Sequence, residues 1–390
     1  MKIDFPGIQT HLTTDEEGIV MGVIRNSSTY SMGPELKKLE DDFSKWLGMP
    51  YCAGLSSCTA ALELAAMLSG VGPNDEVILP AHTFTATALP FLRAGARLVF
   101  ADIDPKTFVV SAVEIRKKIT SKTKVIIPVH LYGLMAPMPE IMSIAKEHKC
   151  MVIEDCAQSP GASIGGKLAG SWGDISCFSF HSQKNINALG EGGLIACRDP
   201  EHYEKILGLR KIGNRPYKGQ TQYWKPAMSN IIEAIPGKHP YNFALPEPNA
   251  AAARCLLMRI SQINNRRNKQ AKRIVESLKE LPFFDFQAIP ANYQHAYHLL
   301  VARVKSSTEK RDQLIETLFE EFTIKCVVQY NPLYNYELFQ HNGYAEKTCP
   351  ASDDFFEHMI SFPFWTEMSD EVTDYISKSV EMATEKVFTK

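Results

Sequence analysis

The chain has 390 residues, of which 42 are basic and 44 acidic, and a formal net charge of −2. This near balance gives no electrostatic reason to expect nucleic acid or an anionic membrane surface as a partner. A hydrophobic content of 45% with 22% charged residues is typical of a soluble globular protein. Because the length exceeds one ordinary hydrophobic core, we expect two domains.

Nine cysteines are scattered along the chain without the close pairs of a metal site, so we predict no bound metal. Their odd number and the lack of a signal peptide predict a cytoplasmic protein. The longest uncharged stretch, 77–92, contains two prolines and four threonines or histidines. It is therefore a poor membrane span, and we expect no membrane partner.

Two helical patterns, 15–25 and 34–47, open the chain, and the second has its apolar residues at helical spacing. A strand from Tyr51 then leads into the turn Ser56-Ser57-Cys58-Thr59 and an alanine- and leucine-rich helix over 60–68. Small hydroxyl residues at a helix start are usually N-caps. The same turn also presents free N–H groups and the positive end of the helix dipole, which suit a phosphate group. Both interpretations are open.

Strand and helix patterns then alternate up to about residue 209. Further strands are expected at 77–80, 97–102, 124–130, 151–153, 175–180 and 194–197, and further helices at 113–119, 138–148 and 202–209. Pro90 falls inside another helical pattern and should kink it. Strands separated by such helices indicate right-handed βαβ units. We therefore predict an α/β fold with a mostly parallel central sheet and helices on both faces.

The alternation breaks at 212–240, which is rich in glycine, proline, asparagine and tyrosine and predicts a long functional loop. A long helix over 248–281 should lead into a smaller α+β domain. Its predicted strands are 297–304, 323–330 and 360–364, and its predicted helices are 310–320 and 370–387. We place the large domain, with its N-terminal helices, at 1–250 and the linking helix and small domain at 251–390.

Two apolar runs are followed by opposite charges. The run 151–153 ends in Glu154-Asp155, and the run 175–180 is followed by Lys184, which has no neighbouring cation. Open α/β sheets place their ligands at the carboxyl ends of strands. A lysine there can form a Schiff base with pyridoxal phosphate (PLP), and a carboxylate can pair with the pyridinium nitrogen. Each residue alone has a simpler interpretation, as a solvated lysine or a strand-end cap.

The stretch 151–193 resembles the PLP-dependent sugar aminotransferases of the DegT–StrS family, which have fold type I. The resemblance rests on Glu154-Asp155-Cys156-Ala157-Gln158, Gly173-Asp174, Phe178-Ser179-Phe180, Lys184-Asn185 and Gly190-Glu191-Gly192-Gly193. It runs along nearly the entire chain and weakens after about residue 280. It implies that Lys184 is the catalytic lysine and that Asp155 pairs with the ring nitrogen of PLP.

The resemblance also implies the remaining site residues. Phe84 would stack on the pyridine ring, Gln158 would hydrogen-bond the 3′-oxygen, and Ser57, Cys58, Thr59 and Ser179 would hold the phosphate. Asn242 would reach the phosphate bound to the second subunit of a homodimer, so that the two active sites are shared. His181 and Tyr330 are candidate residues of the substrate pocket.

The implied function is a transaminase that moves an amino group from glutamate or glutamine to a keto-sugar. The first choice of acceptor is a nucleotide-linked keto-deoxyhexose, for surface polysaccharide or related aminosugar biosynthesis. Open alternatives are a keto-cyclitol or small keto-phosphate acceptor, and a PLP-binding sensor or regulator without catalysis. Dehydratases of the family carry histidine where this chain has Lys184, which argues against them. A regulator would need an added DNA-binding module, and we expect none because the enzyme-like pattern begins within the first fifty residues.

Overall fold

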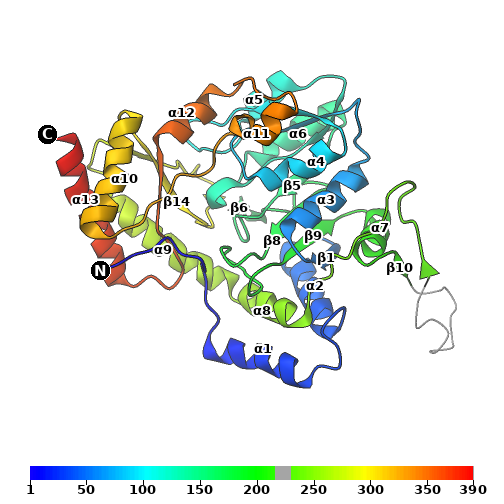
Figure 1. Cartoon of the computed structure of the whole chain (residues 1–390). Helices are drawn as coiled ribbons and strands as arrows, with labels where there is room; N and C mark the ends of the chain where they lie inside the picture. The colour runs from blue at the N-terminus through cyan, green and yellow to red at the C-terminus, as the bar shows by residue number, and fades with distance from the viewer. Residues whose placement is uncertain (216–229, 390) are drawn as a thin grey trace.

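The computed structural model describes residues 1–215 and 230–389. Its central element is a seven-stranded sheet in the order β1-β9-β8-β5-β4-β2-β3 (Figure 1). The strands are β1 (Tyr51–Leu55), β2 (Glu76–Pro80), β3 (Arg97–Ala101), β4 (Thr123–Ile126), β5 (Met151–Asp155), β8 (Ile175–Ser179) and β9 (Gly193–Cys197). Neighbouring strands are parallel except at β9, which runs antiparallel to both β1 and β8. The predicted α/β class with a mostly parallel sheet is confirmed.

Both faces of this sheet are buried, because alternate side chains of each strand enter two different cores. One core lies under α2 (Pro34–Leu47), α5 (Ala112–Lys118) and α6 (Met138–His148), and the other under α3 (Cys58–Ser69), α4 (Leu89–Arg93) and α7 (Pro200–Arg210). In β4, Ile126 belongs to the first core and Val125 to the second. Strands buried on both faces read as continuous apolar runs, which is the pattern seen in the sequence.

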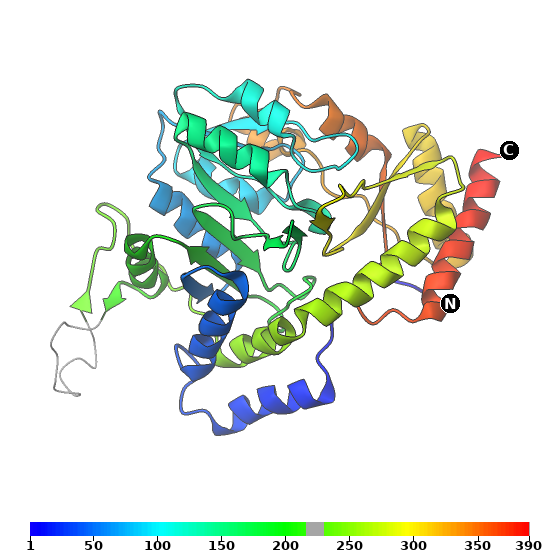
Figure 2. The same cartoon turned by 180° about the vertical axis from the view of Figure 1, so that it is seen from behind.

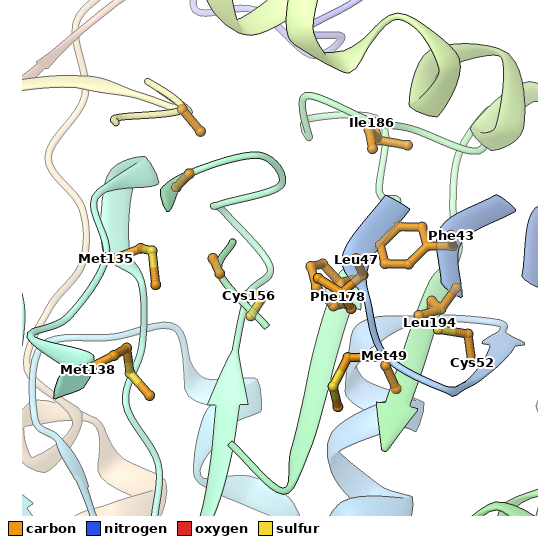
Figure 3. Close-up of a cluster of buried hydrophobic side chains, with 14 of the residues drawn as sticks. Phe43, Leu47, Met49, Cys52, Met135, Met138, Cys156, Phe178, Ile186 and Leu194 are labelled. Carbon is orange, nitrogen blue, oxygen red and sulfur yellow. The ribbon is translucent and has the colours of Figure 1, made fainter. Parts of the chain in front are cut away.

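The first core is dominated by aromatic contacts between α2 and the sheet. Phe43 of α2 packs edge-to-face on Phe178 of β8, with ring centroids 4.8 Å apart (Figure 3). Phe43 also meets Trp46 and Phe180, with centroids at 5.0 and 5.9 Å. Edge-to-face pairs add to the free energy gained by burying the rings. They fix α2 against the strand that leads to Lys184.

Three helices connect the large sheet with the C-terminal part of the chain. α1 (Thr14–Asn26) packs against α8 (Glu247–Met258), and α9 (Ile260–Leu278) runs from α8 to the smaller sheet (Figures 1 and 2). The sequence predicts one helix over 248–281, but the structure divides it at Arg259, whose φ of −115° leaves the helical region. The Arg259 guanidinium pairs there with Glu16 of α1, at 2.6 Å.

The smaller sheet is antiparallel and has the order β12-β14-β15, which confirms the predicted α+β part. Its strands are β12 (Phe284–Phe286), β14 (Leu300–Val304) and β15 (Met359–Phe362), and its larger helices are α10 (Thr308–Phe322) and α13 (Asp370–Phe388). The predicted strand over 323–330 is wrong. Only Ile324 and Val327 make bridges there, to Ile3 and Ser361, and because the two partners come from different parts of the chain no continuous ladder forms. The domain boundary at residue 250 stays a prediction.

The remaining elements are short. They are β6 (Ser163–Ile164), β7 (Lys167–Leu168), β10 (Asn214–Arg215), β11 (Asn230–Ile231), β13 (Tyr293–Gln294), α11 (Glu337–His341), α12 (Pro350–His358) and the 3₁₀ turns Thr85–Thr87, Leu131–Gly133 and Leu333–Asn335. β10 and β11 pair at the base of the predicted loop 212–240, whose middle, 216–229, lies outside the described residues.

Two further expectations concern helices. Pro90 does not kink a helix, because α4 begins at Leu89 and the proline occupies the first turn, where its missing N–H costs nothing. Among the helices of residues 1–215 and 230–389, none combines the length and apolar character needed to cross a membrane.

Candidate active site

The predicted catalytic residues lie along one edge of the large sheet. β5 and β8 are parallel neighbours, with Asp155 opposite Cys177, so that the carboxyl ends of both strands meet. Asp155 ends β5, Ser179 ends β8, and Lys184 lies in the turn that follows. β1 ends at the same edge and leads to the turn at Ser57. Residues separated by more than one hundred positions therefore face one space.

Asp155 is a buried carboxylate with a small number of fixed partners. Its side chain accepts hydrogen bonds from the Thr87 hydroxyl, at 2.8 Å, and from the Ala157 N–H, at 3.1 Å. Burial raises the pKa of Asp155, although these bonds and the charge of Lys184 act against the rise. Thr87 was not among the expected site residues. The only sign of it in the sequence is a hydroxyl residue soon after the end of β2.

Lys184 is partly buried at the same edge. Burial lowers the pKa of its amine, while negative charge at Cys58, Asp155 and Glu191 acts in the opposite direction. Neither Lys184 nor Asp155 forms an ion pair with a described residue. An amine and a carboxylate that share one desolvated space without pairing fit a ligand with an aldehyde at one end and a basic ring nitrogen at the other. The residues present therefore fit PLP. When bound, PLP withdraws electrons from the carbon that carries the amino group.

The turn before α3 suits the phosphate of the cofactor. Ser57 caps α3 by accepting a hydrogen bond from the Ala60 N–H at 3.0 Å, so that the other N–H groups of this helix end stay available. The first residue of β9 must be glycine, because a Cβ at Gly193 would lie 2.3 Å from the Ser57 carbonyl carbon. The Cys58 side chain turns inward: it is 8% exposed, and burial raises the pKa of its thiol. An open cavity of about 440 Å³ adjoins Ser57 and Thr59.

The predicted ring-binding residues meet from three segments. The side-chain oxygen of Gln158 accepts a hydrogen bond from the Tyr132 N–H at 2.7 Å, and its amide group donates to the Tyr330 hydroxyl at 3.1 Å. The Tyr330 ring packs edge-to-face on Phe84, with centroids 5.9 Å apart. Phe84 is 56% exposed, which is high for a phenylalanine and leaves its ring free to stack on a ligand. Tyr132 was missed, because its sequence context carries no signal.

Fewer contacts link the remaining predicted site residues, Ser179, His181 and Asn242, to the ring-binding residues. The Ser179 hydroxyl accepts a hydrogen bond from the His181 N–H at 3.3 Å, which leaves its own proton free for a ligand. His181 is half-buried, and its Nε2 lies 3.8 Å from a carboxylate oxygen of Glu191. Asn242 is exposed, and its amide oxygen accepts a hydrogen bond from Lys211 at 3.4 Å. Within one chain, Asn242 is not brought against Lys184 or Asp155.

Glu154, next to Asp155, supports the strand end from inside. Its carboxylate accepts hydrogen bonds from the N–H groups of Gly170, Trp172 and Gly173 and lies 2.9 Å from His130 Nε2. Burial acts to raise the pKa of Glu154, but the His130 hydrogen bond and these N–H groups leave it below its usual value. Cys156 lies close to this pair. Because both carboxylate oxygens and both His130 nitrogens already have partners, the cluster is accounted for as a hydrogen-bond network.

Comparisons with known proteins point to one family. Residues 13–381 match the sequence profile of the DegT/DnrJ/EryC1/StrS aminotransferase family. The chain is 33% identical over 366 residues, 93% of each chain, to the UDP-N-acetyl-3-dehydro-alpha-D-glucosamine 3-aminotransferase of Acidithiobacillus ferrooxidans. It is 31% identical over 360 residues, 92% of this chain and 93% of the relative, to the dTDP-3-amino-3,6-dideoxy-alpha-D-galactopyranose transaminase of Aneurinibacillus thermoaerophilus.

Solved structures give the same result. Spr1654 of Streptococcus pneumoniae, described as a sugar aminotransferase in its PMP form, superposes with a TM-score of 0.90 at 28% identity. The match covers 99% of this chain and 100% of that chain. The PLP form of the same protein superposes with a TM-score of 0.88, covering 98% of this chain and 99% of that chain.

Proposed function

Because this chain belongs to the DegT/DnrJ/EryC1/StrS aminotransferase family and is a PLP-dependent transaminase, we propose that it moves an amino group from glutamate or glutamine to a nucleotide-linked keto-deoxyhexose. The observation that carries the proposal is that the Lys184 amine and the Asp155 carboxylate lie at one sheet edge, close enough to affect each other's pKa but without an ion pair. The named substrates of the two relatives, both amino- or keto-sugars joined to a nucleotide, support the choice of acceptor. Surface polysaccharide or related aminosugar biosynthesis is the proposed setting.

Each residue has a proposed task. Lys184 holds the cofactor covalently and, as a free amine, moves the proton at the reacting carbon. A desolvated amine with a lowered pKa is more often neutral and therefore a better base. Asp155 keeps the ring nitrogen protonated, and each pKa unit of that bias corresponds to about 1.4 kcal/mol. Gln158 orients the ring through its 3′-oxygen, Phe84 covers one ring face, and the turn 57–59 with Ser179 holds the phosphate.

The test is an amino-transfer assay with purified protein. We would incubate the protein with glutamate or glutamine and a panel of nucleotide-linked 3-keto and 4-keto hexoses, a keto-cyclitol and a small keto-phosphate, and identify the products by mass spectrometry. The expected result is an aminated nucleotide sugar. Amination of only the cyclitol or the keto-phosphate would overturn the proposed acceptor. If the donor removed the visible absorbance of PLP but no acceptor were aminated, only the donor half of the proposed reaction would stand.

We infer further that the working form is a homodimer with shared sites. Support comes from exposed apolar side chains on and after α1, among them Ile19, Met21 and Tyr30, which are 49%, 41% and 55% exposed. The exposed position of Asn242 beside Lys211 is also compatible with a contact to a second subunit. Two-fold dimers are the commonest closed assembly.

The shared site can be tested by mixing two inactive variants. Asn242→Asp would place a carboxylate against the phosphate of the other subunit and should abolish cofactor binding there. In a hybrid with Lys184→Ala, one of the two sites combines an intact Lys184 with an intact Asn242. Activity should therefore return in proportion to the hybrid seen by native mass spectrometry. Hybrids without activity would mean that Asn242 acts within its own chain or not at all.

A further inference from the structure

Two buried histidines lie between β13 and β14, and they differ in their hydrogen bonds. His295 and His298 are each 3% exposed. Both nitrogens of His295 are used: Nδ1 accepts a hydrogen bond from the Tyr297 N–H at 2.7 Å, and Nε2 lies 2.8 Å from the side-chain oxygen of Gln287. The ring of His298 makes no hydrogen bond in the described part of the chain, and its Nδ1 is enclosed without a partner. Buried polar groups normally have partners. His298 is an exception, and its ring therefore has unused hydrogen-bonding capacity.

The backbone of this segment is fixed against the turn that carries Lys184. The Asn185 side chain, one residue after Lys184, donates a hydrogen bond to the Ala296 carbonyl at 2.9 Å. The Arg267 guanidinium donates to the carbonyls of Tyr297 and His298, at 2.7 and 2.9 Å. His298 therefore cannot move far from the lysine turn.

The other side of the segment packs on the loop that positions Gln158. The Ala296 N–H donates a hydrogen bond to the Gly133 carbonyl at 2.9 Å. A Cβ at Gly133 would lie 2.7 Å from the Tyr297 nitrogen and 2.8 Å from the His298 nitrogen, so that only glycine permits this approach. His298 thus lies between the Lys184 turn and the Tyr132–Gly133 loop, at the rim where the small sheet meets the large one.

The surroundings keep the His298 ring uncharged. Burial lowers the pKa of His298 well below its usual value, and the positive charges of Lys184, Arg267 and His181 lower it further. A neutral imidazole donates one hydrogen bond and accepts one. A hydroxyl group offers the matching pair, whereas a carboxylate would prefer a charged imidazolium.

We propose that His298 binds a hydroxyl group of the acceptor sugar close to the carbon that receives the amino group. The inference rests on the proposed keto-sugar acceptor, and it adds a specificity residue to that site. The charge of Lys184 acts on the His298 ring, so the two side chains are near each other, and the Lys184 amine must reach the reacting carbon of both substrates. On this inference, the His298 ring borders the substrate atoms next to that carbon. Glutamate and glutamine carry no hydroxyl group, and His298 therefore acts on the acceptor and not on the donor.

The test separates the two half-reactions in single-turnover experiments. The donor half is followed by the loss of the visible absorbance of the PLP form on addition of glutamate, and the acceptor half by its return when the keto-sugar is added to the pyridoxamine form. His298→Leu should slow the acceptor half by about 10- to 100-fold, the loss expected when one hydrogen bond in a buried site is removed. The donor half should change by less than about threefold. Calorimetry should show weaker binding of the aminated product to the pyridoxamine form by a similar factor.

Matched variants make the result specific. His298→Asn and His298→Gln each retain one hydrogen-bonding group, and one of them should recover part of the acceptor half, which also covers the case in which His298→Leu fails to fold. His295→Leu removes a ring whose nitrogens both bind protein groups, so it should lower the melting temperature and leave the ratio of the two half-reactions unchanged. If His298→Leu slowed the donor and acceptor half-reactions equally, or slowed neither, the inference would be overturned. A wild-type protein that completes the donor half but aminates no keto-sugar would overturn the proposed function, and the inference with it.

Discussion

The active-site edge is built by two regions that treat their polar groups differently. On the side of the large sheet, the carboxylates of Glu154 and Asp155 are held by backbone N–H groups and by Thr87 and His130. On the side of the smaller sheet, His298 has no partner for its ring among the described residues, and the Tyr330 hydroxyl only accepts a bond, from Gln158. The first region suits a cofactor that stays the same from one turnover to the next. The second, on the proposals made above, keeps hydrogen-bonding capacity for substrates.

The largest effect should come from the large-sheet region. Lys184→Ala removes the covalent attachment of the cofactor and the base, so that turnover should be undetectable. PLP should still bind without a covalent bond, because the phosphate and ring contacts remain. Visible spectra before and after borohydride treatment, together with the amino-transfer assay, provide the measurement. Near-normal transfer by this variant would refute the role of Lys184.

Asp155→Asn tests the same region with its shape kept. The amide cannot hold the ring nitrogen protonated, so we expect kcat to fall by about 1000-fold or more, roughly 4 kcal/mol. The fold should persist, because the asparagine oxygen can still accept the Ala157 N–H while its amide NH2 donates to the Thr87 hydroxyl. Steady-state kinetics and a thermal melt measure the two quantities. A loss below about tenfold would indicate that Asp155 only terminates the strand.

Gly133→Ala acts on the junction between the regions. Its φ of +105° and the Cβ contacts with Tyr297 and His298 predict a loss of about 1–3 kcal/mol in unfolding free energy. Activity should fall as well, since the 296–298 segment must move. Gly343→Ala is the matched control, with φ +88° and no atom within 4 Å of its Cβ. The control variant shows the cost of backbone strain without a steric clash. If urea unfolding gave the same loss of free energy for both variants, the close approach of Gly133 to Tyr297 and His298 would contribute nothing to the loss.

Tyr330→Phe should have the smallest effect. Burial raises the pKa of Tyr330 to about 12, so that its hydroxyl stays protonated at neutral pH. Loss of this group frees one end of Gln158 and should lower kcat/KM by about 3- to 10-fold. No titration step from Tyr330 should appear near neutral pH in the wild-type profile. Tyr334→Phe is the control, because its hydroxyl bonds Cys349 and Asp353 instead of Gln158 and its loss should change stability only.

The same two regions differ in how far the sequence predicts them. The large sheet was predictable because buried parallel strands such as β5 are continuous apolar runs, and because Asp155 and Lys184 directly follow such runs. Thr87 and Tyr132 were not predictable, since their roles depend on loops folding back over the strand ends. In the smaller region, 323–330 looks like a strand but makes only two isolated bridges, to Ile3 and to Ser361. β12 is too short to give a pattern. The break in helix 248–281 was not predictable, because it coincides with the pairing of Arg259 with Glu16, a long-range contact that the local sequence does not show.

Arg267 has a consequence for how the protein can be shortened. Its fully buried guanidinium bonds the backbone and side chain of Gln9 as well as the His298 carbonyl, and the Gln9 N–H donates to Ser182 in the Lys184 turn. A guanidinium that loses such partners stays desolvated with its donors unmet. The N-terminal residues up to Gln9 therefore help to hold the Lys184 turn in place. An affinity tag placed before Met1 should be tolerated, whereas a gene trimmed beyond Gln9 should yield a protein that binds cofactor poorly.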